Sequence, residues 1–477
     1  MNLCSRIRKT EVTRFFGLAA SLGVAAGLVL GCSSSVVPGS NINSPSVSVP
    51  VLITDAPSDQ LVAFSLTLNS ITLTDTAGQT ASILPTPTTI EVCHLNGIQA
   101  PLLTASVPED TYVSATLTFS DPQITYITGA GLPVTVTPSL ATTSFKLTFP
   151  APITISNTST SLLVDLIAAQ SVTISGATVT VSPVFNVTNV PPASTIPPPG
   201  PNGTGMQQMG TVVSVSGTTL VIEPGSGPNF TLTTNSSTVL QGFSSLSALT
   251  AGELVQVDFV LQSGGVFLAT RIQLAPPPPS GQPPINLLSG TVTSVSSGSF
   301  KMVVMQGLGP VASPVSATAV SVFTVTTNSS TTFAITPQFQ SLAGLPFTPT
   351  FTAANLTAGQ SVGVVASSLS GSTATASNVY LIPQTLGGTV TAISTSGSYT
   401  AYTLALPSGN AFTALTGAST VTVYTSAATV GPVAPTATNN TPIKVNSQVR
   451  FNGLVFNLGG GSFAMVAGCS PDGPPGI

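Results

Sequence analysis

The chain has 477 residues, of which only 5% are charged and 42% are hydrophobic. This length suggests about three to five domains. Ordinary soluble proteins have roughly 25% charged residues, far more than this chain. Disordered polyelectrolytes combine high charge with low hydrophobicity, so this class is excluded. Ser and Thr dominate the polar residues, and Thr and Val favour the pleated surface of strands, so we expect an all-β protein.

The distribution of charge argues against one class of partner. The net charge is −4, and four of the nine basic residues lie within the first 14 positions. Five basic residues remain in the rest of the chain: Lys146, Arg271, Lys301, Lys444 and Arg450. They are scattered along the sequence, so we expect no basic stripe that could neutralise phosphates, and no nucleic-acid partner.

The N-terminal segment carries an export signal. Basic residues within 1–16 precede an uncharged apolar run over 17–30, which is too short to span a membrane and fits a signal peptide. The run ends in Leu28-Val-Leu-Gly-Cys32, which resembles the lipobox of bacterial lipoproteins. This resemblance implies a signal peptide over 1–31, lipidation (palmitate and diacylglycerol) of Cys32 and a flexible tether over 32–46. An ordinary secretory signal with an incidental cysteine is the alternative.

Two cysteines remain for other roles, because Cys4 leaves with the signal and Cys32 accepts lipid. An oxidising cell envelope permits a disulfide between Cys93 and Cys469, although nothing in the sequence shows that they meet.

Proline divides the chain. The Pro-rich stretches 191–208 and 275–288 are typical of stiff spacers. They delimit a first block over 47–190, a second over 209–274 and a third over 289–383. A divergent block over 387–468 and a tail over 469–477 follow. We expect each block to have its own core, with few packed contacts across the spacers.

The later blocks repeat one another. Gly210-Thr-Val recurs as Gly290-Thr-Val and Gly388-Thr-Val, Thr233-Thr-Asn-Ser-Ser-Thr238 recurs at 326–331, and Leu249-Thr-Ala-Gly252 recurs at 356–359. Such internal repetition marks one supersecondary unit used several times. Five or six short strands in 65 to 90 residues predict a small barrel for each copy.

These motifs resemble two families. The Gly-Thr-Val opening and the Ala269-Thr-Arg-Ile272 ending are similar to domain of unknown function 5666, mostly over 209–274. The first block resembles domain of unknown function 4382, and this resemblance implies a β-sandwich. The segments that carry it are Val51-Leu-Ile-Thr-Asp-Ala-Pro57, Leu95-Asn-Gly97, Leu102-Leu103, Pro108-Glu-Asp-Thr-Tyr112, Leu162-Leu-Val-Asp-Leu166 and Val181-Ser-Pro-Val-Phe185. Neither family implies an activity.

Chemistry-bearing residues are scarce. His94 is the only histidine of the chain, and on a strand it would point away from its neighbour Cys93, so we expect neither a zinc site nor a catalytic triad. Asp55, Asp59, Glu109 and Asp110 are candidate oxygen ligands for Ca²⁺ at one end of the sandwich. The alternative is that Asp55 only holds its own loop in an Asx-turn.

The sequence therefore predicts a non-catalytic cell-envelope lipoprotein without a cofactor, which acts as a structural or binding module. We expect a cell membrane to hold it through Cys32, the outer membrane in a cell with two membranes. Its other partner would be an envelope protein or a polysaccharide. An accessory protein that binds polysaccharide or Ca²⁺ is the alternative, and a hydrolase is the third possibility.

Overall fold

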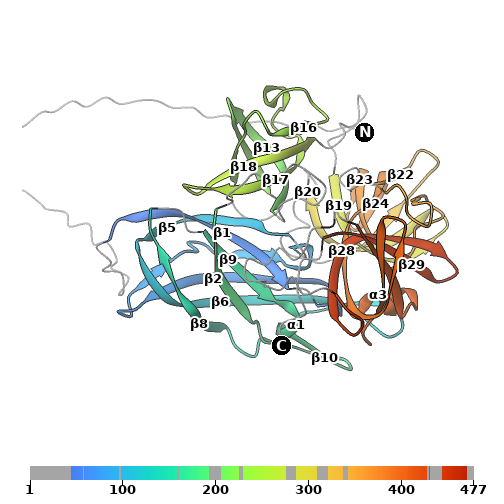
Figure 1. Cartoon of the computed structure of the whole chain (residues 1–477), viewed down its shortest axis with the longest axis horizontal. Helices are drawn as coiled ribbons and strands as arrows, with labels where there is room; N and C mark the ends of the chain where they lie inside the picture. Colours follow the sequence, from blue (N-terminus) through green and yellow to red (C-terminus); the bar gives the residue numbers. More distant parts are fainter. Residues whose placement is uncertain are drawn as a thin grey trace, which may run out of the picture. The chain divides into compact units, whose positions relative to one another are not determined.

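The computed structural model describes residues 44–56, 58–95, 98–157, 161–192, 206–224, 229–274, 286–308, 321–336, 342–426, 429 and 443–469. The chain is all-β, as predicted (Figure 1). Within the described residues, the few helices are all too short to cross a membrane. The lipobox cysteine Cys32 and most of the two proline spacers lie outside these residues.

The first block is a sandwich of two sheets. One sheet has the strand order β12-β9-β1-β5; in the other, β3-β2-β6-β7 is extended by β4 on β2 and by β8 on β6. The bounds are β1 Ser46–Ala56, β2 Leu61–Asp75, β3 Thr80–Ser82, β4 Thr88–Glu91, η1 Cys93–Leu95, β5 Ala100–Pro108, β6 Asp110–Ile127, β7 Pro133–Val136, β8 Ser144–Ile155, β9 Ser161–Ile167, α1 Ala168–Ser171, β10 Val172–Ser175, β11 Thr178–Val181 and β12 Phe185–Val190.

The apolar segments that suggested the first family lie side by side. Strand β1 pairs with β9 in parallel, with Val51 opposite Leu162 and Ile53 opposite Val164. All four side chains belong to the core between the two sheets. At the other end of β1, the buried Tyr112 hydroxyl donates to the carbonyl of Pro108 (2.9 Å), in the manner of a tyrosine corner. These motifs therefore have structural roles.

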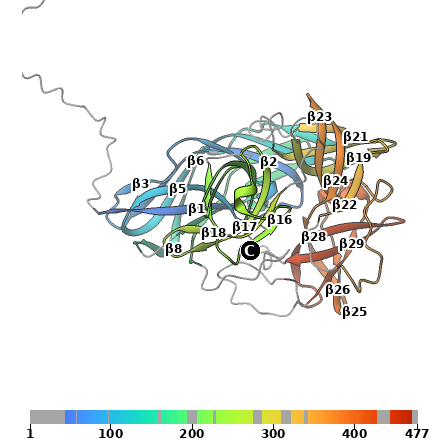
Figure 2. The same ribbon diagram turned by 90° about the horizontal axis from the view of Figure 1, so that it is seen from above.

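Each later block is a small barrel. The first barrel comprises β13 Gln207–Ser216, β14 Thr219–Pro224, β15 Phe230–Thr233, β16 Val239–Gln241, η2 Leu246–Ala248, β17 Leu254–Gln262 and β18 Val266–Leu274. The second comprises β19 Asn286–Ser296, β20 Ser299–Leu308, β21 Ser321–Thr326, β22 Thr332–Ile335, β23 Ser361–Ser370 and β24 Thr373–Leu381. The third comprises β25 Gln384–Ser396, β26 Tyr399–Ala405, α3 Ala411–Thr416, β27 Thr420–Thr425, β28 Gln448–Gly459 and β29 Ser462–Cys469 (Figure 2).

All three barrels have the same topology. The third closes in the order β25-β26-β27-β29-β28, and the parallel pair β27–β29 completes it. The first and second barrels follow the same order and close through the parallel pairs β15–β18 and β21–β24. This Greek-key arrangement of five strands is that of an OB-type barrel. The divergent last block is therefore a third copy of the repeat.

The repeated motifs have repeated geometry. Thr238 Oγ1 donates to the carbonyl of Ala269 (2.7 Å), Thr331 to that of Ala376 (2.8 Å) and Thr429 to that of Ala467 (3.0 Å). Each of these hydrogen bonds connects the last Thr of the Thr-Thr-Asn-Ser-Ser-Thr motif, or its counterpart in the third copy, to the last strand of its barrel. The third copy thus retains this threonine and also Thr425 at the second position of the motif, although the other four residues differ.

The Thr-Ala-Gly turn shows why the third copy was harder to recognise. Gly252 and Gly359 have φ values of +93° and +87°, and each N–H donates to the first strand, at Val212 and Val292. In the third barrel Asn446 takes this place, with φ +72° and a bond from its N–H to the carbonyl of Val390 (2.8 Å). Asparagine is among the few residues other than glycine that tolerate this conformation, so the turn survives without its glycine.

Each block has a core cluster of its own, but packed contacts cross the boundaries between blocks. Leu52 and Leu163, on the outer face of the sandwich sheet, belong to the core of the first barrel, and Leu52 is 0% exposed. Leu454 and Phe456 of the third barrel likewise belong to the core of the second. The domain boundaries themselves remain predictions, but packed contacts cross them.

Candidate functional site

Three ionisable side chains of the sandwich, Asp55, Cys93 and His94, lie near Glu91, at the end of β4. Its carboxylate is buried and accepts four hydrogen bonds, from the backbone N–H groups of Phe64 (3.0 Å), Cys93 (3.1 Å) and His94 (2.8 Å) and from Nδ1 of His94 (3.1 Å). Glu91 therefore fixes the short helix η1 and orients the imidazole of His94. The sequence analysis missed Glu91, although its spacing of three residues from His94 was a visible signal.

Asp55 lies close to this group and is 4% exposed. Its position on β1 continues the line of Val51 and Ile53, so the carboxyl group faces the core. Oδ1 accepts from the N–H of Ala168 (3.3 Å), and Oδ2 has no hydrogen-bond partner among the described residues. Burial raises the pKa of Asp55 well above its ordinary value; Asp165 and Glu91 raise it further, while the Ala168 N–H and Arg450 lower it.

Cys93 is a partly buried, free thiol in the structure, so the predicted bridge to Cys469 is not formed there. Cys469 ends strand β29, paired with Asn452 of the third barrel. Burial raises the pKa of the Cys93 thiol well above its ordinary value, and the negative charges of Glu91 and Asp55 add to the effect. Because the thiolate is the reactive form, this environment makes Cys93 a poor nucleophile and a poor metal ligand.

The four carboxylates predicted to bind Ca²⁺ do not form one site. Glu109 donates its N–H to the carbonyl of Pro45 (2.8 Å), just before β1 begins. Asp55 lies ten residues further along this extended strand, about 33 Å away at 3.3 Å per residue. Asp110 adjoins Glu109, and its carboxylate accepts from the N–H of Thr111 (2.6 Å). Asp59 forms an ion pair with Arg450 (3.1 Å).

The structure also differs from the local conformations considered for His94 and Asp55. His94 lies on a short 3₁₀ helix rather than on a strand, and Asp55 bonds to a distant segment rather than to its own loop. Among the residues that the structure describes, no three His, Cys, Asp or Glu side chains are grouped as metal ligands would be.

The position of Asp55 leads to a prediction about pH. The folded protein holds the Asp55 proton more tightly than the unfolded chain does, because the pKa of Asp55 is raised on folding. The stability that this proton confers is complete below the ordinary carboxyl pKa of about 4. It is lost as the pH rises through the higher pKa of the folded protein. Asp55→Asn cannot ionise, so its stability should decline less between acidic and alkaline pH than that of the wild type. Urea unfolding across this range measures the difference. Equal pH profiles would contradict the prediction.

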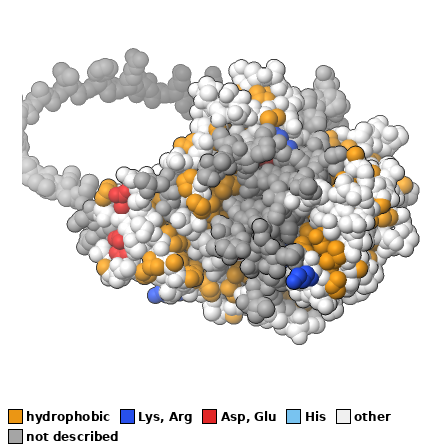
Figure 3. All heavy atoms as spheres, in the orientation of Figure 1, with side chains coloured by type: hydrophobic (Ala, Val, Ile, Leu, Met, Phe, Trp, Pro, Cys, Tyr) orange, Lys and Arg blue, Asp and Glu red, His pale blue; other side chains and the backbone are white. Residues whose placement is uncertain are grey.

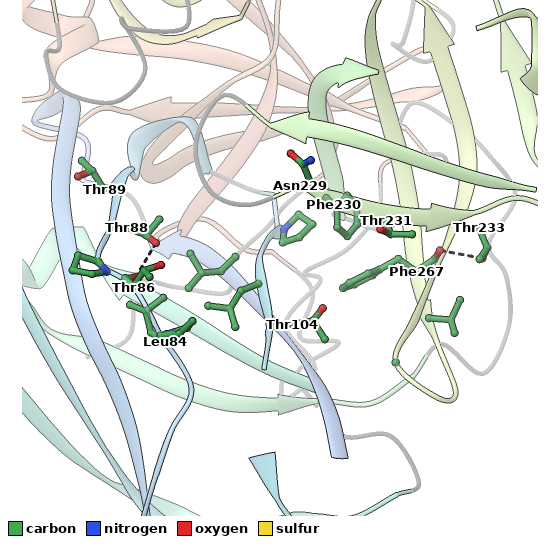
Figure 4. Close-up of a pocket in the computed structure, with 17 residues that line it drawn as sticks. Leu84, Thr86, Thr88, Thr89, Thr104, Asn229, Phe230, Thr231, Thr233 and Phe267 are labelled. Atoms are coloured by element: carbon green, nitrogen blue, oxygen red, sulfur yellow. Dashed lines mark hydrogen bonds between the residues drawn. The ribbon is translucent and has the colours of Figure 1, made fainter. Parts of the chain in front are cut away.

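A pocket of about 930 Å³ lies where the sandwich meets the first barrel (Figure 4). The sandwich contributes Leu84–Thr89 and Pro101–Thr104, and the barrel contributes residues of β15 and of the β17–β18 hairpin. Gly265, at the tip of this hairpin, lies so close to β1 that an added Cβ would be 3.2 Å from Cγ of Pro50. The hairpin therefore rests on the sandwich and forms one wall of the pocket.

None of the described residues that line this pocket has an ionisable side chain. The lining consists of leucine, proline, threonine, asparagine, glycine, valine and phenylalanine. Thr88 donates to the carbonyl of Thr86 (3.3 Å) and Thr233 to that of Phe267 (3.2 Å), while Thr104, Asn229 and Thr231 carry further polar groups (Figure 4). The surface drawn in Figure 3 shows the same character, with few charged atoms among many uncharged ones. The pocket thus suits an uncharged ligand.

Two family models match parts of the chain. Residues 46–181 match the family model described as domain of unknown function DUF4382, and residues 209–273 match that described as domain of unknown function DUF5666. No curated protein matches the chain. Among solved structures, the chain is similar to "drosophila Unr CSD456", with 11% identity, 55% of this chain and 94% of that chain covered, and a TM-score of 0.13. The chain thus carries a DUF4382 domain followed by a DUF5666 domain, in the order predicted from the motifs.

Proposed function

We propose that this protein is an exported lipoprotein that acts at the cell envelope as a non-catalytic binding module. The uncharged pocket between the sandwich and the first barrel is the observation that carries this proposal. Its described residues offer hydroxyl and amide groups and apolar surface to a ligand, and none of them is an acid or base for proton transfer. The only histidine of the chain is bonded to Glu91, and burial raises the pKa of the Cys93 thiol well above its ordinary value.

The position of the pocket on the barrel also supports binding. OB-type barrels commonly bind ligands on their second and third strands and on the loop between the last two strands. Here β15 is the third strand, and Gly265 and Val266 lie at the turn between β17 and β18. This support comes from the fold alone. Because phosphates need cationic partners, an uncharged lining favours a neutral ligand over a nucleic acid.

Binding in this pocket can be tested by filling it. Thr231 is an exposed residue of β15 in the lining, and Thr231→Trp should abolish binding of a neutral probe, either an uncharged peptide or a neutral glucose hexamer. Wild-type affinity should change little over a tenfold range of ionic strength, because screening weakens only interactions between charges. Titration calorimetry measures both effects.

The matched control is Ser214→Trp, since Ser214 is exposed on β13 of the same barrel but does not line the pocket. This variant should bind as the wild type does. If neither neutral probe binds, or if Ca²⁺ alone binds, the pocket proposal is wrong. Binding of the hexamer alone would favour the alternative function, an accessory protein for polysaccharide.

The anchoring part of the proposal has its own test. Cys32→Ala removes the thiol that would accept diacylglycerol, so the variant should remain unprocessed or move to the aqueous phase in detergent partitioning. The wild type should enter the detergent phase, because two or more acyl chains hold a protein stably at a bilayer. Equal partitioning of the two proteins would refute the lipobox interpretation and leave the pocket proposal intact.

A further inference from the structure

Two edge strands of the sandwich border the pocket. Among the described strands, β5 ends its sheet and pairs along its length only with β1, and β4 pairs only with β2 in the opposite sheet. Residues 101–104 of β5 and 88–89 of β4 both belong to the pocket lining. An edge strand presents backbone N–H and C=O groups that have no partner within its own sheet. The pocket therefore combines an uncharged lining with backbone groups available for pairing.

The residue just before β5 forms a bridge with another segment. Gln99 and Met206 form a parallel bridge, and the N–H of Gln207 donates to the carbonyl of Gln99 (3.2 Å). The next residues belong to β13, which pairs with β17, with Gln207 opposite Asp258. Among the described residues, no strand pairs with the edge beyond Gln99, where the pocket begins. At the start of this edge, the chain itself thus already forms one strand-like bridge.

We propose that the pocket binds an extended, uncharged peptide segment, which adds as a strand to the β5 edge at Pro101–Thr104. In this binding mode backbone hydrogen bonds supply affinity, and flanking pockets select alternate side chains. Four residues of edge span about 13 Å, enough to pair with about four residues of a peptide. Alternate side chains of the peptide would face the apolar surface at Phe230 and Phe267. The inference rests on the proposed binding function and names its ligand class.

The backbone at Thr104 provides the sharpest test. Thr104 is exposed and lies in the lining, and Thr104→Pro removes one N–H from the edge. Ser106→Pro is the matched control, because Ser106 is also exposed, lies on the same strand two residues away and does not line the pocket. The probe is an acetylated and amidated octapeptide of alternating threonine and valine, titrated into the full chain. We expect Thr104→Pro to weaken binding at least about tenfold and Ser106→Pro to leave it unchanged.

Modified probes identify the kind of contact. Two further octapeptides carry N-methyl groups on either the odd or the even amides, so that each loses the donors of one edge. At least one should bind at least about tenfold more weakly if backbone pairing holds the peptide. Should Thr104→Pro fail to fold, as judged by circular dichroism, Thr231→Trp should still abolish binding of the octapeptide from the barrel side.

Three results would overturn the inference: no binding of the octapeptide, equal binding of both methylated peptides and the parent, or equal affinity of folded Thr104→Pro and the wild type. If the neutral glucose hexamer binds and the octapeptide does not, the peptide inference fails while the proposed binding function stands. If neither probe binds, both fail.

Discussion

Arg271→Met should destabilise the protein by about 3 to 5 kcal/mol, because it leaves the carboxylate of Asp258 buried without its cation. Asp258 and Arg271 lie opposite each other on β17 and β18, form an ion pair and are both buried. Gln207 adds a hydrogen bond to Asp258 (2.9 Å). Burial raises the pKa of Asp258 although Arg271 lowers it, so part of the loss should be recovered at acidic pH as Asp258 takes up a proton.

The second barrel supplies the matched control for this variant. Val365 and Asn378 occupy the same cross-strand position there, so this protein already accommodates an uncharged pair in the same fold. The double variant Asp258→Val with Arg271→Asn copies that pair and should recover most of the stability lost in Arg271→Met, since a buried ion pair is often replaceable as a unit. Urea unfolding of the full chain measures all three proteins. A loss below about 1 kcal/mol for Arg271→Met would show that Asp258 is not held in a dry environment.

The repeats were predictable because their constraints act through the backbone. Three such constraints each restrict the residue type at one position. They are a close approach of two strands that needs glycine, a hydrogen bond from a Thr hydroxyl to a fixed carbonyl, and a turn with positive φ. Asn446 shows the limit of this reasoning, since a residue other than glycine met the same need and made the third copy look weaker.

The sequence of β1 contains a pattern that indicates the contact between the sandwich and the first barrel. Val51, Leu52 and Ile53 are consecutive and all apolar, and such a run is typical of a strand buried on both faces. One face of β1 indeed faces the sandwich core, and Leu52 on the other face enters the first barrel. Proline spacers set the length of the connection, but they do not prevent the blocks from packing together.

The candidate site was less predictable than the fold. Sequence reasoning searches for ionisable residues, and it found Asp55, Asp59, Glu109 and Asp110, which strand geometry places at opposite ends of β1 or in an ion pair. The pocket is lined instead by uncharged residues that are common throughout the chain. Nothing distinguishes these residues until two edge strands and a barrel hairpin bring them together. A site of this kind depends on tertiary structure rather than on a motif.

Gly290→Ala should cost about 3 kcal/mol, the upper end of the usual cost of overpacking, because the overlapping atom belongs to the backbone and cannot move aside easily. An added Cβ would lie 1.9 Å from the carbonyl oxygen of Val303, on the neighbouring strand β20. The equivalent distances are 2.6 Å for Gly388 and 2.7 Å for Gly210, again to backbone oxygens of the second strand of each barrel. The Gly-Thr-Val motif therefore marks the point where the first two strands of each repeat approach most closely.

The size of the overlap predicts an order among the three variants. Gly290→Ala should be the most destabilising, and Gly388→Ala and Gly210→Ala should have smaller, similar costs. Gly129→Ala is the control, because Gly129 has no atom within 4 Å of its added Cβ and no positive φ, and its cost should stay within about 0.5 kcal/mol. Urea unfolding of the full chain gives the four values. If Gly290→Ala is as stable as Gly129→Ala, the motif glycine serves some purpose other than the close approach of the two strands.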